Sequence, residues 1–123
     1  MVSENLEERE LRSYFDYMVK HATNSRFRIF LYKSRNHALI CMLLGSCNKN
    51  DRGFSYEEIC NLIPAKLASR TTVLTILQEG ILLNYFVKEI DVRDKRKQLY
   101  KLQKPQKNRI VSWAHDMTKI FGL

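Results

Sequence analysis

The sequence has few of the residues on which most enzyme and metal sites depend. Its 123 residues include four glycines, two prolines and three cysteines. The glycines are scattered and form no phosphate-binding loop, and no Cys-x-x-Cys pair indicates a zinc site. His21, His37 and His115 share no metal-ligand spacing with one another or with the cysteines. No pairing of a nucleophile with a base stands out either, so we expect a protein that is not an enzyme and holds no cofactor or metal.

Long apolar runs are also absent. No segment approaches the roughly 20 apolar residues needed to cross a bilayer, and the longest run, 38–45, is typical of a buried helix. The acidic start of the chain argues against a signal peptide, and an odd number of cysteines suits a reducing compartment. Cys47, before a polar loop, is the one candidate for a reactive thiol, but no basic residues cluster beside it. We expect a single domain located in the cytoplasm.

Positive charge is abundant and unevenly distributed. The net charge is +8 and the pI is about 9.6, which favours a polyanionic partner, either nucleic acid or an anionic membrane face. Lys20 to Asn36 contains five basic residues and no acid, and Lys88 to Arg109 contains nine basic and three acidic residues. The first seventeen residues contain two basic and five acidic residues. The chain therefore has an acidic N-terminal end and a basic region near its C-terminal end.

The middle of the chain predicts two helices joined by a turn. Ser55 is a candidate N-cap with Glu58 three residues on, and apolar residues follow at helical spacing. Pro64 interrupts this helix, and a second periodic segment runs to Gly80, where we expect it to end. These signals predict a helix-turn-helix over about 55–80.

A β-hairpin is expected directly after this unit, over about 85–102. Aromatic and β-branched residues dominate 85–90, apolar residues mark 99–102, and the segment between them is polar. Arg93, Lys95, Arg96 and Lys97 outnumber two aspartates there. So small a projection cannot bury these charges, so they must meet water or phosphate.

The hairpin carries a specific motif. Asp91-x-Arg93-Asp94-x-Arg96-x-x-Leu99-x-x-Leu102, after Gly80-Ile81-Leu82 and a strand, resembles the wing of the MarR family of bacterial transcriptional regulators. The resemblance covers roughly 55–102, and 39–44 fits the helix that precedes the motif in that family. It implies a mainly α (α+β) winged helix-turn-helix with a two-stranded β-wing and terminal dimerisation helices. Such proteins often bind small aromatic effectors, but no residue here calls for one.

Candidate DNA contacts follow from the predicted second helix and the wing. With Val73 at the centre of the buried side, Thr71, Thr75 and Gln78 lie opposite and Arg70 and Leu74 flank them. These side chains suit base edges in the major groove, although the same pattern fits a solvated helix face. In the wing, Arg93 and Lys95 are expected to reach DNA, whereas Arg96 either does so or holds Asp91 or Asp94. The full expected set is Ser69, Arg70, Thr71, Leu74, Thr75, Gln78, Arg93, Lys95 and Arg96.

Apolar stripes mark two terminal helices, predicted over about 4–22 and 105–121, while residues 26–32 fit either a short helix or an extended loop. The stripes either pack on each other and on the core, or meet the same helices of a second chain. The resemblance favours a homodimer. The expected interface residues are Leu11, Tyr14, Phe15, Met18, Ile110, Trp113, Met117, Ile120 and Phe121.

The resulting functional hypothesis is a sequence-specific regulator of transcription that binds double-stranded DNA as a homodimer on a near-palindromic site. The alternative is a winged-helix protein used for protein contact, or an architectural protein that binds nucleic acid without sequence choice, because one fold hosts all of these. No membrane partner is expected.

Overall fold

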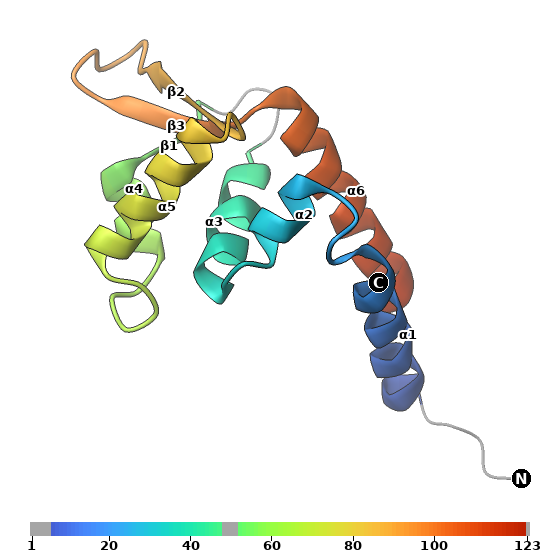
Figure 1. Ribbon diagram of the computed structural model, residues 1–123. Coiled ribbons are helices and arrows are strands. Elements are labelled where there is room, and N and C mark those ends of the chain that lie inside the picture. The colour runs from blue at the N-terminus through green and yellow to red at the C-terminus, as the bar shows by residue number, and fades with distance from the viewer. Residues whose placement is uncertain (1–5, 48–51, 123) are drawn as a thin grey trace, which may run out of the picture.

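The structure is a computed structural model that describes residues 6–47 and 52–122. Helices make up most of it, and a small sheet lies at one end (Figure 1). In chain order the elements are α1 (Leu6–His21), α2 (Arg26–Leu31), α3 (Arg35–Gly45), β1 (Phe54–Ser55), α4 (Tyr56–Leu62), α5 (Arg70–Leu82), β2 (Phe86–Ile90), β3 (Gln98–Leu102) and α6 (Lys104–Ile120). The fold class is α+β, as predicted. The expected start of the first helix, near residue 4, lies outside the described residues.

The β2–β3 hairpin forms where the sequence predicts it, and a third strand extends the sheet. β3 lies between β1 and β2 and is antiparallel to both. Phe86 is opposite Leu102 and Ile90 opposite Gln98, while Phe54 of β1 is opposite Tyr100. The sheet therefore has three strands instead of the expected two. A strand of two residues is too short to show an alternating pattern in sequence.

Local interactions set the ends of α4. Ser55 Oγ accepts a hydrogen bond from the Glu58 backbone N–H at 3.2 Å, and Glu58 Oε1 accepts from the Ser55 backbone N–H at 3.3 Å. The predicted capping box is thus present. Ile63 at the other end has an extended backbone, because the ring of Pro64 disfavours a helical residue before it.

α5 begins at its own cap and continues beyond its predicted end. Ser69 Oγ accepts from the Thr72 backbone N–H at 3.1 Å. The expectation that the helix stops at Gly80 is wrong: it runs to Leu82, and Asn84 takes the left-handed conformation with φ 63°. Gly80 serves packing instead, since a Cβ there would lie 2.1 Å from Cδ2 of Phe86. The glycine lets β2 approach the helix closely.

The core lies where α2, α3 and α5 meet the sheet. Residues 26–32, for which the sequence left two alternatives, form a helix capped by Ser25, and half of its six residues are buried. Phe30 packs edge-on against the rings of Tyr85 and Phe86, with centroids 5.3 and 5.7 Å away. A short helix thus joins the core by aromatic contacts that lie far apart in sequence.

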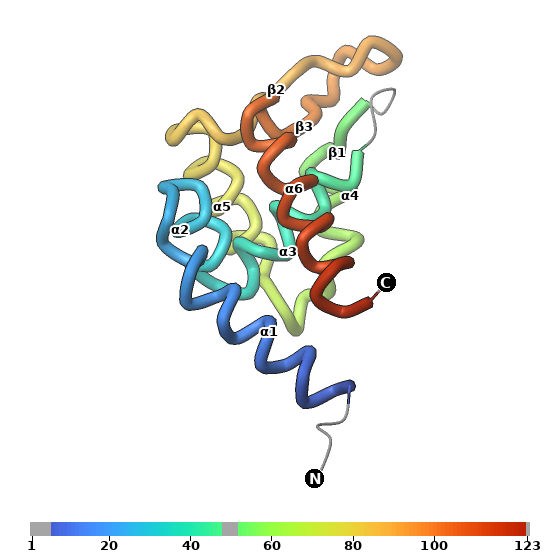
Figure 2. The backbone as a smooth tube through the Cα atoms, turned by 90° about the vertical axis from the view of Figure 1, so that its right-hand side faces the viewer, coloured from blue at the N-terminus to red at the C-terminus, as the bar shows by residue number. Residues whose placement is uncertain are grey.

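α1 lies against α6, on the side of the molecule away from α4 and α5 (Figures 1 and 2). The rings of Tyr14 and Phe121 are 5.6 Å apart, and the Tyr17 hydroxyl donates to Asp116 Oδ2 at 3.0 Å. No residue of α1 is buried. None of the described helices combines the length and the apolar character that a membrane span requires.

Candidate nucleic-acid interface

α5 presents a polar face on the side opposite the core. Thr71, Thr75 and Gln78 are exposed and Leu74 is half-buried. Thr75 Oγ1 donates to the Thr71 carbonyl at 2.9 Å, which leaves the lone pairs of that hydroxyl free to accept another hydrogen bond. The structure therefore brings four predicted contact residues together on one surface.

Ser69 and Arg70 join α4 to α5. Besides capping the helix, Ser69 Oγ donates to Thr72 Oγ1 at 3.0 Å. Arg70 forms an ion pair with Glu57 of α4, and its guanidinium lies 5.3 Å from the ring centre of Tyr56. The hydrogen bond to Glu57 raises the pKa of Arg70. Both residues were predicted to contact DNA, but in the free protein they already have partners, which Arg70 would have to exchange on binding.

Glu79 anchors the other end of α5. Its carboxylate accepts a hydrogen bond from Lys33 Nζ at 2.9 Å and lies 3.3 Å from Nε2 of His37. His37 is buried, and its Nδ1 lies 2.6 Å from Ser34 Oγ. Burial alone would raise the pKa of Glu79, but the hydrogen bonds from Lys33 and His37 hold it below its ordinary value. These contacts tie α5 to the segment between α2 and α3.

Two aspartates shape the turn of the hairpin. Asp91 is 5% exposed, accepts from the Arg93 backbone N–H at 3.0 Å and pairs with Arg52 at 3.4 Å. Asp94 accepts from both the backbone N–H and Nε of Arg96 at 3.1 Å. The Arg96 hydrogen bonds hold the pKa of Asp94 below its ordinary value. Of the roles considered for Arg96, the structure therefore shows the one in which it holds Asp94.

The remaining cations of the turn are unpaired. Arg93, Lys95 and Lys97 are exposed, and within the described ranges none of their side chains forms an ion pair. The two aspartates are occupied by other groups. Lys97 acts electrostatically on Asp94, so the positive charges of Arg93 and Lys95 remain available to phosphates at the tip of the hairpin.

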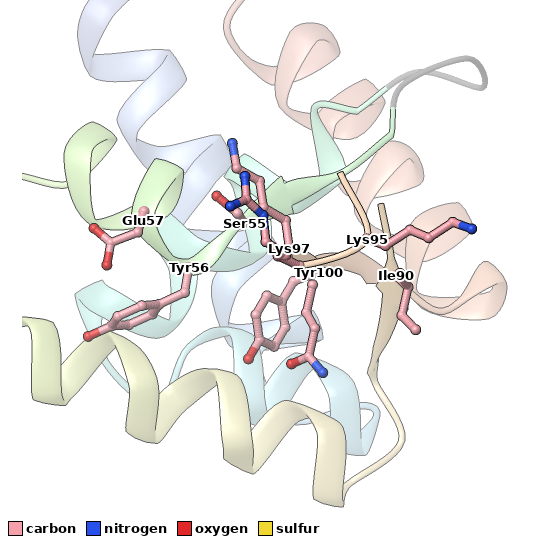
Figure 3. A pocket seen from close by; sticks show the side chains of 9 residues that line it. Ser55, Tyr56, Glu57, Ile90, Lys95, Lys97 and Tyr100 are labelled. Carbon is pink, nitrogen blue, oxygen red and sulfur yellow. The ribbon is translucent and has the colours of Figure 1, made fainter. Parts of the chain in front are cut away.

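A groove of about 360 Å³ separates the hairpin from the start of α4 (Figure 3). In Figure 3 the rings of Tyr56 and Tyr100 point toward α5, while Lys95 extends away from them. The other polar residues of the lining are Ser55, Glu57, Arg96, Lys97 and Gln98. Sequence reasoning missed Tyr56, Gln98 and Tyr100, because only the β1–β3 pairing and the turn into α4 bring them together. Aromatic rings beside unpaired lysines suit contact with a nucleic-acid backbone.

The residues predicted for a dimer interface divide into an exposed stripe and a groove. On α1, Leu11 and Phe15 are 67% and 59% exposed, and Met18 is half-buried. The groove, about 440 Å³ in volume, lies between α1, α3 and α6. Its lining includes four of the predicted residues, Tyr14, Trp113, Met117 and Phe121.

Part of the α6 stripe is used within one chain. Ile110 is 4% exposed and packs on Gly45. A Cβ added to Gly45 would lie 2.7 Å from Cγ2 of Ile110. Ile110 was expected in the dimer interface, but it belongs to the core of the single chain. Trp113 Nε1 donates to the Tyr32 hydroxyl at 2.8 Å, and Ile120 is half-buried. Packing of the terminal helices on each other and on the core thus accounts for much of α6 and for Tyr14 of α1, but Leu11 and Phe15 of the α1 stripe remain exposed.

The cysteines offer no accessible thiol cluster. Burial raises the pKa of Cys41 to about 12, and Cys47, the candidate reactive thiol, is only 8% exposed. No three or more His, Cys, Asp or Glu side chains of the described residues gather closely enough to hold a metal ion.

α5 and the β2–β3 hairpin lie on the side of the molecule away from α1 (Figure 1). The exposed residues of α5, the cations of the turn and the tyrosine-lined groove therefore place hydroxyl, amide and positively charged groups on neighbouring elements. Comparison of the chain with protein-family models, curated proteins and solved structures found no significant match.

Proposed function

We propose that this protein is a winged helix-turn-helix regulator of transcription that binds specific sequences of double-stranded DNA. In this assignment α4 and α5 are the helix-turn-helix, α5 is the recognition helix, and the β2–β3 hairpin is the wing. The supporting observation is that α5, which carries exposed hydroxyl and amide groups, lies next to the β2–β3 hairpin, whose turn carries exposed cations. Location in the cytoplasm remains a prediction.

The α5 face has the chemistry that a major groove requires. Gln78 can form two hydrogen bonds with N6 and N7 of adenine, the Thr71 hydroxyl can donate or accept, the Thr75 hydroxyl can accept, and Leu74 can contact a thymine methyl. Arg70 becomes available to guanine once it leaves Glu57, an exchange that costs little because both side chains are more than half exposed. Sequence choice would therefore reside in α5.

The wing contributes affinity without sequence choice. Asp91 and Asp94 take up the backbone N–H groups of the turn, so the side chains of Arg93 and Lys95 project from a defined loop. Their contacts with phosphates or the minor groove release counterions, and this term depends on salt and not on sequence.

The proposed DNA-binding unit is a homodimer. Leu11 and Phe15 remain exposed, and burying a large apolar side chain contributes about 1.5–3 kcal/mol. A second copy of α1 and α6 on this surface would relate two recognition helices by a two-fold axis. Their half-sites would then lie about 10 base pairs apart on a near-palindrome.

Binding of the Thr71→Ala, Thr75→Ala double variant tests the proposal. We expect it to lose about 1–3 kcal/mol per base contact on the preferred duplex and little on random DNA, measured by fluorescence anisotropy. Thr118→Ala is the matched control, because this exposed threonine of α6 also donates to a carbonyl of its own helix. Equal losses on both duplexes would remove α5 from sequence reading and favour an architectural role. No DNA binding at all would favour a role in protein contact.

A further inference from the structure

A second polar pocket lies where the α1–α2 turn meets α6. Its volume is about 270 Å³, and it is lined by Asn24, Ser25, Arg28, Arg109 and Ser112. Every lining residue is polar, two are arginines, and none is acidic. Its lining comes from the α1–α2 turn, α2 and α6, and it shares no residue with the proposed DNA-binding surface.

The two arginines of this pocket lack counter-ions. Within the described parts of the chain, neither Arg28 nor Arg109 has a carboxylate within 4 Å. Asp116, two turns along α6 from Arg109, accepts the hydroxyl of Tyr17 and forms no ion pair with either arginine. The guanidinium of Arg28 lies 5.4 Å from the ring centre of Tyr17. This contact holds Arg28 in place but leaves its charge uncompensated by any acid.

The Arg28 side chain also has an unsatisfied donor. Its Nη1 is buried and has no hydrogen-bond partner. A buried donor without an acceptor is unfavourable, so a small movement of the guanidinium that brought Nη1 to an oxyanion in the pocket would satisfy it. Arginine is well suited to oxyanions because its planar fork of N–H groups matches two oxygen atoms at once.

Two hydroxyls provide further donors. Ser25 Oγ accepts from the Arg28 backbone N–H at 3.1 Å, so its own proton remains free to donate. The Ser112 hydroxyl, on the same side of α6 as Arg109, lines the pocket as well. A tetrahedral oxyanion between the two arginines would therefore meet charged and neutral donors from both α2 and α6.

We propose that this pocket binds a small oxyanion of phosphate or sulfate type, either free or as the phosphate group of a metabolite. Binding would neutralise Arg28 and Arg109 and link the α1–α2 turn to α6. The pocket differs from the apolar groove between α1, α3 and α6, and the inference does not depend on the proposed function.

Titration of the full chain with inorganic phosphate tests the inference. Calorimetry and amide chemical shifts should show saturable binding, and the melting temperature should rise more with phosphate than with chloride at equal ionic strength. Arg109→Gln should weaken phosphate binding at least tenfold. Lys119→Gln, the same charge change on an exposed residue of α6, should leave it unchanged. Arg28→Gln should reproduce the loss, provided that its circular dichroism spectrum matches that of the parent.

Three outcomes would overturn the inference. One is the absence of saturable phosphate binding, and another is equal binding by the parent, Arg109→Gln and Lys119→Gln. The third is displacement of phosphate by a duplex of random sequence, which would assign the two arginines to the DNA backbone. A phosphomonoester that binds more tightly than free phosphate, with the same dependence on Arg109, would identify a metabolite as the source. Each of these results is independent of whether Thr71 and Thr75 read DNA.

Discussion

α5 and α1 both carry an apolar face, but a single chain buries residues of that face only in α5. α5 buries Val73, Ile76, Leu77 and Gly80 in the core and turns polar groups outward. α1 buries none of its residues, and its apolar stripe, including Leu11 and Phe15, faces outward. The core contacts of a single chain therefore fix the position of α5. Leu11 and Phe15 of α1 remain exposed in the described part of the chain, and in the proposed dimer a second copy would cover them.

Core truncation in α5 should give the largest effect. Leu77 is fully buried, so Leu77→Ala should lower the free energy of unfolding by about 2–5 kcal/mol through lost burial and a new cavity. Leu11→Ala on α1 is the matched control. At concentrations where the chain is monomeric, it should change the free energy of unfolding, measured by urea denaturation, by less than about 0.5 kcal/mol. Comparable losses in the two variants would contradict the difference drawn between these helices.

A polar substitution on the α1 stripe should affect association and leave the monomer intact. Phe15→Ser should weaken the dimer by about 2–3 kcal/mol across its two copies, because the ring is 59% exposed in one chain and would be covered in the dimer. Sedimentation at micromolar concentration measures this, with Val111→Ser, an exposed apolar residue of α6, as the comparison. A parent chain that stays at 14.6 kDa would contradict the proposed dimer.

The anchor of α5 should respond to acid. The pKa of Glu79 is lower in the folded protein than its ordinary value of 4.5, so this group stabilises the fold above pH 4.5 and loses that contribution as the pH falls further. Glu79→Gln should cost roughly 1–2 kcal/mol at pH 7, and the difference from the parent should shrink toward pH 3. Glu57→Gln, which breaks an exposed ion pair, should cost less than about 0.5 kcal/mol. A loss in Glu79→Gln that does not vary with pH would exclude the ion pairs as its cause.

The smallest effect is expected in the wing. Arg93→Ala keeps the backbone N–H that Asp91 accepts, so the turn should survive while the charge is removed. Arg93→Ala and Lys95→Ala should each reduce the slope of log affinity against log salt by about one unit, on specific and random DNA alike. Lys119→Ala, on α6, should leave the slope unchanged. An unaltered slope in the wing variants would show that these cations do not meet phosphates.

Features set by neighbouring residues could be predicted from the sequence. The capping box of Ser55 and Glu58, the end of α4 before Pro64 and the turn built around Asp91 and Asp94 each depend on a few adjacent positions. The outward face of α5 followed in the same way from its periodicity. The prediction of the hairpin is therefore confirmed, and the residues expected on the outer side of α5, Thr71, Thr75 and Gln78, are exposed.

Features that depend on distant contacts could not be predicted. β1 exists only because β3 pairs with it, and Gly80 is explained by Phe86, which comes from the next strand. Local sequence presented Gly80 as a helix end. The Tyr56–Tyr100 groove likewise joins residues 44 positions apart. Whether the α1 stripe packs against its own chain or a second one likewise depends on contacts with residues that lie far away in the sequence.

Selection from a pool of random duplexes tests the central claim most directly. The account predicts recovery of a near-palindromic motif with half-sites about 10 base pairs apart, and loss of enrichment when the Thr71→Ala, Thr75→Ala variant is used for selection. Recovery of no motif by a protein that binds DNA, or the same motif with the same enrichment by the variant, would contradict sequence reading by α5.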